Sequence, residues 1–544
     1  MRTDERGDDF EVWEGANREE ADRGRSFPEE GERAATLDPP SDELTRLAEL
    51  FHGLAVDYVS SPVAPRVFPP ASAERVAEVL RRPLPEEGAD FDELADECKW
   101  VMRYGRANGH PRMFGYVASP AAPVAVLAEW LAAALNQNVT SWRSAPAATE
   151  IERTVVRWLA ELIGYAGRGV NEGCGGLLTG GGSAANLAAV FVALRTRAAA
   201  EGAGGARSLA QRGLWGAGAP MTLYASDQVH LSVPKAADLL GVGREHVRLV
   251  AADGAFRLDV RALREMIEAD LRAGLRPFCV VANAGTVSTG AVDPLADAAR
   301  LARDHGLWLH VDGAYGAPAA AVPEKRELFR GLELADSIAL DPHKWLYSPV
   351  GVGCLLLREP ARARAAFADT GGDYIQIFEE EGEEAFAFWD YGPELSRPFR
   401  ALKVWAVLRY HGARRVAAAI AEDCALAEHL AELVRASEDF ELTAPTTLGI
   451  CCFRYLTPGA RRELEAAADD EQREQANRRL DELNARLLHR LQRGGAAYLS
   501  NAVVRGRFTL RASVTNFRTT RRDLAVTLDA VRRAAREEAQ TPGP

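Results

Sequence analysis

Five short polar segments, each following an apolar run, hold the side chains of this sequence that could do chemistry. The first is the glycine-rich segment 179–183, which ends in Gly182 and Ser183 and precedes a helical pattern. Glycines let backbone N–H groups approach an anion, and the start of a helix adds partial positive charge. Because the segment lacks the spacing of a P-loop or of a dinucleotide fingerprint, it is either another anion-binding loop or an ordinary turn.

The next two segments offer an imidazole and a hydroxyl. His230 follows the apolar run 222–225, and Thr286 lies in a tight turn after the run 278–283. A single histidine in such a place is more often structural, although a flat imidazole beyond a strand could also stack on a planar ring. These two residues indicate a function only in combination with the other polar segments.

A carboxylate and an amine complete the set. Asp312 ends the run 307–311, where burial penalises its charge unless a cation, such as a protonated ring nitrogen, lies beside it. Lys344 follows the run 337–340 beside His343, and it is one of only five lysines among the 65 basic residues. A chain this rich in arginine is expected to keep lysine mainly where an amine must lose its proton and attack. The nearby His310 does not complete a clear set of metal ligands.

An anion-binding loop, a stacking imidazole, a strand-end carboxylate and a strand-end lysine are together the parts of a pyridoxal 5′-phosphate site. The lysine amine forms a Schiff base with the cofactor. The carboxylate keeps the pyridine nitrogen protonated, so that the ring withdraws electrons. Each signal is weak by itself, but the four in this order predict such a site.

Alternating apolar runs and helical patterns from residue 177 to residue 358 predict the element that positions these groups, an α/β domain with a largely parallel sheet. Ligands of such sheets bind beyond the carboxyl ends of the strands. The last run, 354–358, follows closely on its predecessor and is a candidate for an antiparallel strand. The predicted strands are 177–179, 222–225, 247–250, 278–283, 307–312, 337–340 and 354–358.

The whole chain divides into four predicted regions. Residues 1–40 hold 13 acidic residues and 6 arginines and are predicted to be a disordered tail. A helical segment follows at 41–120, with amphipathic patterns at 41–60 and 72–105. The large α/β domain spans 121–396, and a smaller α+β domain spans 397–538 with strands near 448–455 and 507–515.

Several stretches resemble the group II pyridoxal-phosphate-dependent decarboxylases, which include aromatic-L-amino-acid and glutamate decarboxylases. The most specific are LWLHVDGAYG at 307–316 and DPHKWLYSPVGVGCLLLRE at 341–359, and the resemblance covers roughly residues 45–535. It implies fold type I, with a mostly parallel seven-stranded sheet and helices on both faces. It also implies a homodimer with active sites at the interface and decarboxylation of an L-amino acid.

The resemblance carries roles to individual positions. Lys344 resembles the Schiff-base lysine, Asp312 the partner of the pyridine nitrogen, and His230 the ring-stacking histidine. Ala314 resembles the small residue on the opposite face of the ring, and His343 a contact of cofactor or substrate. Further cofactor contacts are expected from Gly182, Ser183 and Thr286. Tyr116, Ser119, Asn138 and Thr140 align with regions that help to form the substrate pocket across the dimer.

The chain also departs from the family pattern. Asp341 stands where animal enzymes have an asparagine near the phosphate. An ionised carboxylate there would repel the phosphate, so we expect Asp341 to point elsewhere or to bond the backbone. Val287 replaces a second threonine, while Asn138 and Thr140 replace bulkier apolar residues, which weakens the case for a purely aromatic pocket.

The catalytic loop is the most ambiguous segment. In the family a mobile loop supplies a tyrosine that protonates Cα after CO2 has left. Counting back from residues 397–403 without gaps places Phe388 at this position, whereas a short gap would bring Tyr391 or Tyr374 there. Phenylalanine would remove the proton donor and could divert the reaction to an aldehyde. We favour a gap in this variable segment.

Composition narrows the remaining possibilities. The net charge of −13 argues against a nucleic-acid partner, and no apolar run reaches the length of a membrane span. Seven cysteines without CxxC spacing and no signal peptide predict a reduced, cytoplasmic protein. The expected substrate is a small molecule, first an aromatic amino acid (tryptophan, tyrosine, phenylalanine or DOPA), with glutamate or 2,4-diaminobutyrate as alternatives. The alternative to an enzyme is a non-catalytic scaffold protein of the same fold.

Overall fold

The computed structural model describes residues 37–60, 66–165, 175–200, 209–216, 218–368 and 383–540. These belong to two compact units, one made of residues 1–60 and 84–99 and the other of residues 61–83 and 100–544. The predicted acidic tail lies almost wholly outside the described residues, so its disorder stays a prediction.

The helical patterns near the N-terminus form three helices. The first is α2 (Ser41–Ser60), as predicted. The pattern predicted over 72–105 is split into α3 (Ala73–Leu80) and α4 (Phe91–Tyr104). The residues between them include Pro83, Pro85 and Gly88, and proline removes a backbone donor that a continuous helix needs.

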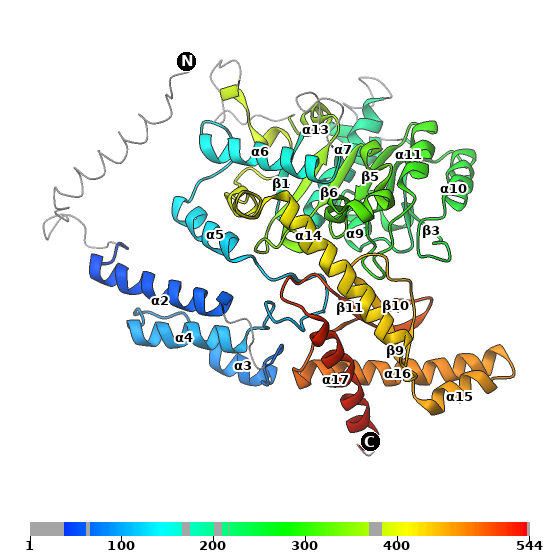
Figure 1. The fold of residues 1–544 in the computed structure, drawn as a ribbon. Coiled ribbons are helices and arrows are strands. Elements are labelled where there is room, and N and C mark those ends of the chain that lie inside the picture. The colour runs from blue at the N-terminus through cyan, green and yellow to red at the C-terminus, as the bar shows by residue number, and fades with distance from the viewer. Residues whose placement is uncertain are drawn as a thin grey trace, which may run out of the picture. The chain divides into compact units, whose positions relative to one another are not determined.

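The large sheet has seven strands in the order β1-β7-β6-β5-β4-β2-β3. Figure 1 labels four of them, β1, β6, β5 and β3. Only β7 runs antiparallel to its neighbours, so the predicted mostly parallel sheet and its antiparallel last strand are both confirmed. Most strand residues are buried, which explains why the sequence shows unbroken apolar runs rather than alternation. The strands are β1 (Gly175–Thr179), β2 (Met221–Ser226), β3 (Val247–Val250), β4 (Arg276–Asn283), β5 (Trp308–Asp312), β6 (Ser337–Leu340) and β7 (Gly353–Leu357).

Helices pack on this sheet as the fold-type I prediction requires. The helix α7 (Gly182–Ala199) contacts β4, β5, β6 and β7, while α10 (Val260–Arg272) and α11 (Leu295–Asp304) contact β4. The side chain of Asp259 caps α10 by accepting hydrogen bonds from two backbone N–H groups of its first turn. The other helices of this region are α9 (Ser232–Leu239), α12 (Pro342–Trp345) and α13 (Pro360–Phe367).

Three longer helices flank the large sheet. The helices α5 (Pro123–Leu135) and α6 (Pro146–Leu162) each begin with a proline, which suits the first position of a helix. Both pack against α14 (Ala401–Arg435), and this helix is broken at Gly412, where φ is +74°. The sequence predicts a helix over 398–436 without this break.

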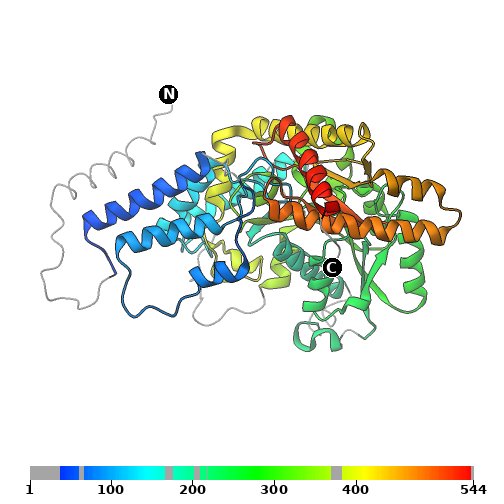
Figure 2. The same cartoon turned by 90° about the horizontal axis from the view of Figure 1, so that it is seen from below.

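A smaller antiparallel sheet, in the order β10-β11-β9-β8, forms the second core. Its strands β9 (Ile450–Tyr455) and β11 (Arg507–Ser513) were predicted, whereas β8 (Phe440–Leu442) and β10 (Ser500–Val504) were missed. The sequence predicts one highly charged helix at 460–493, whereas the structure has two, α15 (Pro458–Ala466) and α16 (Asp470–Gly494). The final helix α17 (Arg521–Gln540) was not predicted, and it lies against α16 (Figure 2). No helix among the described residues is long and apolar enough to cross a membrane.

Candidate active site

A cavity of about 830 Å³ lies at the carboxyl ends of β1, β4, β5 and β6, where open α/β sheets bind ligands. Parallel strands bring their carboxyl ends to one edge, so residues far apart in sequence meet there. Eight of the predicted site residues line this cavity: Tyr116, Gly182, Ser183, His230, Asp312, Ala314, His343 and Lys344.

The lysine of this cavity is paired with a carboxylate. Lys344 lies on the short helix α12, and its Nζ is 2.9 Å from Oδ2 of Asp341. The expectation that Asp341 points away is therefore wrong: its buried carboxylate turns into the cavity, where the lysine supplies the opposite charge. The other oxygen, Oδ1, is buried and has no hydrogen-bond partner among the described residues.

The glycine-rich segment forms a tight cradle at the start of α7. Gly181 has a φ of +151°, a conformation that favours glycine. A Cβ atom added at Gly182 would lie 2.8 Å from Oδ2 of Asp341 and 2.9 Å from Cβ of Ala314. No side chain fits at Gly182, so the backbone at the N-terminus of an 18-residue helix faces the cavity directly. Such a terminus suits a phosphate group.

The carboxylate and the imidazole are held by other polar groups. Asp312 accepts a hydrogen bond on Oδ2 from Nδ2 of Asn186 (2.8 Å) and one on Oδ1 from the backbone N–H of Ala314 (3.1 Å). Nδ1 of His230 lies 2.8 Å from Oγ of Ser232. Burial lowers the pKa of His230, and the nearby charge of Asp312 opposes part of this shift. The imidazole is therefore neutral at neutral pH.

Two of the other predicted positions lie outside the cavity lining. Oγ1 of Thr286 is hydrogen-bonded to Oγ1 of Thr289 (3.0 Å) and accepts from the backbone N–H of Ala291 (3.1 Å). Thr286 thus holds the turn after β4 rather than a ligand in the cavity. Oγ of Ser119 is buried and has no hydrogen-bond partner among the described residues.

Asn138, Thr140 and Phe388 belong to a scaffold around the buried Arg397. Oδ1 of Asn138 accepts a hydrogen bond from the backbone N–H of Arg397 (2.8 Å). The backbone carbonyl of Thr140 accepts one from the N–H of Phe388 (2.8 Å). The ring of Phe388 is fully buried beneath the guanidinium of Arg397, with 4.2 Å between Cζ and the ring centroid. These three residues are not brought to the cavity.

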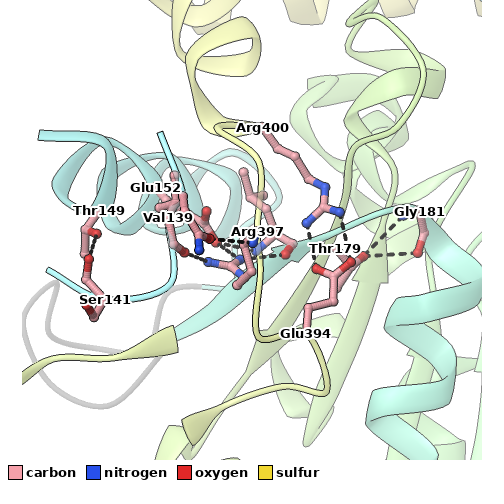
Figure 3. Close-up of polar contacts among 11 residues, drawn as sticks. Val139, Ser141, Thr149, Glu152, Thr179, Gly181, Glu394, Arg397 and Arg400 are labelled. Carbon is pink, nitrogen blue, oxygen red and sulfur yellow. Dashed lines mark hydrogen bonds and ion pairs between the residues drawn. The ribbon is translucent and has the colours of Figure 1, made fainter. Parts of the chain in front are cut away.

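Arg397 joins this scaffold to the large sheet (Figure 3). Its guanidinium donates to the backbone carbonyls of Val139 (2.7 Å) and Leu178 (2.8 Å), and it forms a buried ion pair with Glu152. The same carboxylate accepts a hydrogen bond from the backbone N–H of Leu178 in β1. A buried pair with this many hydrogen bonds holds the segment before α14 firmly against β1.

The two tyrosine candidates for the catalytic loop lie in different parts of the chain. The ring of Tyr391 stacks on Phe386 at 5.5 Å between centroids, outside the cavity lining. Tyr374 lies in residues 369–382, outside the described residues. Among the described residues, the structure therefore brings neither Phe388 nor a loop tyrosine to the site.

The sequence analysis missed a buried arginine that lines the cavity. Arg511 comes from β11 of the smaller sheet, and its guanidinium donates to the backbone carbonyls of Val287 (2.9 Å) and Tyr116 (2.8 Å). Its Nη2 is buried and has no hydrogen-bond partner among the described residues. The available signal was a charged residue inside an otherwise apolar strand pattern, FTLRA at 508–512.

Comparison with known proteins now assigns the family. Residues 74–456 match the family described as "Pyridoxal-dependent decarboxylase conserved domain". The chain belongs to the pyridoxal-dependent decarboxylase family. An aromatic-L-amino-acid decarboxylase of Bacillus atrophaeus is 31% identical to this decarboxylase, over 91% of the present chain and 96% of the relative. A phenylacetaldehyde synthase of Petunia hybrida is also 31% identical, over 86% and 88% of the two chains.

Solved structures agree with this membership. A crystal structure of Oryza sativa TDC with PLP and tryptamine superposes on the decarboxylase with a TM-score of 0.81 and 29% identity. The match covers 92% of this chain and all of the other. Fold type I, decarboxylase activity and pyridoxal 5′-phosphate as the cofactor, all predicted from the sequence, are thereby confirmed.

The residues of the cavity fit this cofactor. Lys344 offers an amine, the start of α7 offers a cradle without side chains for the phosphate, and Asp312 offers acceptor oxygens for a protonated ring nitrogen. The carboxylate of Asp341, beside both Lys344 and Gly182, is the one group in this set whose charge opposes the phosphate.

Proposed function

We propose that the protein decarboxylates an aromatic L-amino acid (tryptophan, tyrosine, phenylalanine or DOPA) to the corresponding amine and CO2. One observation carries the proposal: a single cavity holds Lys344, Asp312 and the unpaired Nη2 of Arg511. An amino-acid decarboxylase needs a lysine for the cofactor and a carboxylate that accepts from the cofactor's ring nitrogen. It also needs a cation for the carboxylate of the substrate. The names of the relatives support an aromatic substrate.

The cofactor residues have distinct proposed roles. Lys344 binds the cofactor covalently, and the backbone of Gly182 and Ser183 binds its phosphate. Asp312 accepts a hydrogen bond from the ring nitrogen and keeps it protonated, while His230 and Ala314 lie against the two faces of the ring. When bound, the cofactor supplies an electron sink for the bond pair that CO2 leaves behind at Cα.

The chain's own residues then position the substrate. We assign Arg511 to the substrate carboxylate, because a buried guanidinium with an unpaired N–H forms strong, charge-assisted hydrogen bonds with an anion. Tyr116, Val117 and Tyr315 line the same cavity and offer apolar surface to a side chain. The proton that replaces the carboxylate at Cα must come from an acid, for which the candidates remain Tyr374 and Tyr391.

An aldehyde product is the second candidate, since several of the related proteins are named as aldehyde synthases. That reaction consumes the amino acid, O2 and water and gives the aldehyde, CO2, ammonia and hydrogen peroxide. Within the single chain the ring of Phe388 is buried beneath Arg397, which weighs against a place for this residue at the reacting atom. Glutamate and 2,4-diaminobutyrate remain alternative substrates. For glutamate, Arg511 could hold the side-chain carboxylate instead.

We also propose that the active protein is a homodimer in the cytoplasm. Three leucines four residues apart on α5 (Leu127, Leu131 and Leu135) are about half exposed in the single chain. Residues at this spacing share one face of a helix, and an exposed apolar face of this kind is typical of an interface.

Mass spectrometry of the products tests the proposed function. The cofactor-loaded protein is incubated in air with a pool of L-amino acids that includes DOPA, glutamate and 2,4-diaminobutyrate. We expect an amine one CO2 lighter than an aromatic member of the pool. An aldehyde with an equal amount of peroxide would select the second candidate, and an amine from glutamate or 2,4-diaminobutyrate would replace the substrate class.

The Lys344→Ala variant tests the site itself. We expect it to lose both the visible absorbance of the bound cofactor and all product, because no other lysine among the described residues lines the cavity. Lys325→Ala, which removes a lysine that donates to the backbone carbonyl of Thr447, is the matched control and should keep both. An unchanged cofactor spectrum in Lys344→Ala would refute the assignment.

A further inference from the structure

A chain of buried polar side chains runs from the large sheet to two residues of the cavity lining that would contact the cofactor ring. It begins on β5 and β6, passes through α7 and ends at Asp312 and His230. Buried polar groups are costly unless each finds a hydrogen-bond partner. The intermediate members, none of which has a role in the proposed reaction, are Trp308, Ser337, His310, Asn186 and Ser232.

Asn186 is the branch point, and its surroundings determine its orientation. Its Nδ2 lies 2.8 Å from Oδ2 of Asp312 and 2.8 Å from Oγ of Ser232. A carboxylate oxygen only accepts hydrogen bonds, so we assign the nitrogen of the amide to this side. Oδ1 of Asn186 then faces Nε2 of His310 at 2.9 Å, and this ring nitrogen must carry a proton.

His310 anchors the amide from the side of the sheet. Its side chain is fully buried, and its Nδ1 lies 2.9 Å from Oγ of Ser337. That hydroxyl oxygen accepts from Nε1 of Trp308 (2.8 Å), which leaves the hydroxyl proton for Nδ1. Burial lowers the pKa of His310 to about 4, so the ring is neutral at neutral pH, with its single proton directed at Asn186.

The other branch reaches His230. Because Oγ of Ser232 accepts from Asn186, the hydroxyl proton is directed at Nδ1 of His230, 2.8 Å away. The backbone N–H of Ser232 also donates to this Nδ1, at 3.2 Å. With two donors pointing at it, Nδ1 carries no proton, and the proton of the neutral ring lies on Nε2.

We propose that Asn186 is a positioning residue for the decarboxylation, which holds Asp312 in place and sets the proton position on His230 through the chain anchored by His310. The inference rests on the roles proposed above for Asp312 and His230. Loss of the amide would remove one of the two donors to the Asp312 carboxylate and would free the Ser232 hydroxyl, so that His230 could change its tautomer.

Two variants that keep the branched shape of the Asn186 side chain test this role. Asn186→Leu removes all hydrogen bonds of the amide, and Asn186→Asp replaces the donor to Asp312 by an acceptor. We expect both to raise the dissociation constant of pyridoxal 5′-phosphate by about ten- to a hundredfold, as for loss of a hydrogen bond to a charged group. We also expect kcat to fall while KM changes little, because neither variant touches the substrate.

A pair of His310 variants separates positioning from packing. The amide nitrogen of glutamine can replace Nε2 of histidine as the donor to Asn186, so His310→Gln should restore most of the cofactor affinity that His310→Leu loses. Asn484→Leu is the matched control for burying a hydrophobic side chain at a buried asparagine site. This residue is fully buried in the smaller domain, where it bonds Tyr455 and Leu480. It should lower stability and leave cofactor affinity unchanged.

Three results of these measurements would overturn the proposed role of Asn186. Wild-type affinity in both Asn186 variants would overturn the proposal, as would equal losses in His310→Gln and His310→Leu. An affinity loss in Asn484→Leu equal to that in Asn186→Leu would show general destabilisation and would overturn it too. Cofactor affinity is measured without substrate, so these comparisons remain decisive if the product assay contradicts the proposed function.

Discussion

At the scale of single residues, Asp341 is the feature that most distinguishes this site. Its carboxylate pairs with Lys344 and lies against Gly182, where the phosphate is expected. Two neighbouring negative groups repel each other by an energy on the order of 1–3 kcal/mol at the effective dielectric of a protein site. The carboxylate of Asp341 therefore holds Lys344 in place in the free protein and lowers the affinity for the cofactor.

Asp341→Asn should bind pyridoxal 5′-phosphate about tenfold more tightly than the wild type, because the change removes a negative charge and keeps the shape. Fluorescence quenching during cofactor titration measures the two dissociation constants. Asp390→Asn is the control, since Asp390 pairs with Arg364 and does not line the cavity. Weaker binding in Asp341→Asn would mean that the carboxylate serves the lysine more than it opposes the phosphate.

At the scale of elements, a buried carboxylate joins α14 to the turn that carries Lys344. Oδ2 of Asp423 accepts hydrogen bonds from Nε1 of Trp345 and from the hydroxyl of Tyr347, each at 2.8 Å. Burial raises the pKa of Asp423 to about 7, although both hydrogen bonds act in the opposite direction. The active-site turn is thus tied to a group that titrates near neutral pH.

This link predicts how stability depends on pH. The folded carboxyl keeps its proton up to about pH 7, whereas in the unfolded chain aspartate releases it near pH 4, so the folded state binds more protons between these values. Raising the pH from 5 to 8 should therefore lower the free energy of unfolding of the wild type relative to Asp423→Asn, by on the order of 3 kcal/mol. Urea unfolding at both pH values measures this difference.

The absolute stability of Asp423→Asn is not the test, because the amide also changes the hydrogen bonding at every pH. The exposed Asp529, which pairs with Arg532, supplies the control Asp529→Asn. It should follow the wild type at both pH values. A parallel pH dependence of the wild type and Asp423→Asn would show that Asp423 is ionised in the folded protein throughout this range.

At the scale of the whole molecule, the apolar face of α5 predicts the assembly. Leu131→Glu places a charge in the middle of this face, so sedimentation velocity at micromolar concentration should show a shift from dimer to monomer relative to the wild type. Leu271→Glu, at an exposed leucine of α10, is the matched control and should stay dimeric. If Leu131→Glu sediments as the wild type does, α5 does not lie at the interface.

Local sequence patterns were sufficient for the large sheet and for half of the site. All seven strands of that sheet were predicted, because buried parallel strands appear as continuous apolar runs. Gly182, Asp312 and Lys344 each follow such a run, and the parallel arrangement then brings them to one edge. The short strand β8 and the alternating strand β10 lack this signal and were missed.

The rest was decided by contacts between segments distant in the sequence. The resemblance suggested pocket positions across the dimer at Asn138 and Thr140, and counting without gaps placed Phe388 in the catalytic loop. Within the single chain, Asn138 and Phe388 contact the buried Arg397, and the backbone carbonyl of Thr140 accepts a hydrogen bond from Phe388. Arg511 enters the cavity from a different sheet, which no pattern near the glycine-rich loop could indicate.

The sequence by itself thus determined the family, the cofactor and the strands that carry its candidate binding residues. These properties follow from short segments of neighbouring residues, because each apolar run and the motif after it can be recognised without the rest of the chain. Only the tertiary structure decided that Asp341 turns toward Lys344, that Asn186 joins Asp312 to His310, and that Arg511 completes the cavity. A side chain's direction and protonation depend on the charges and donors packed around it, and those come from segments that meet only in the folded protein.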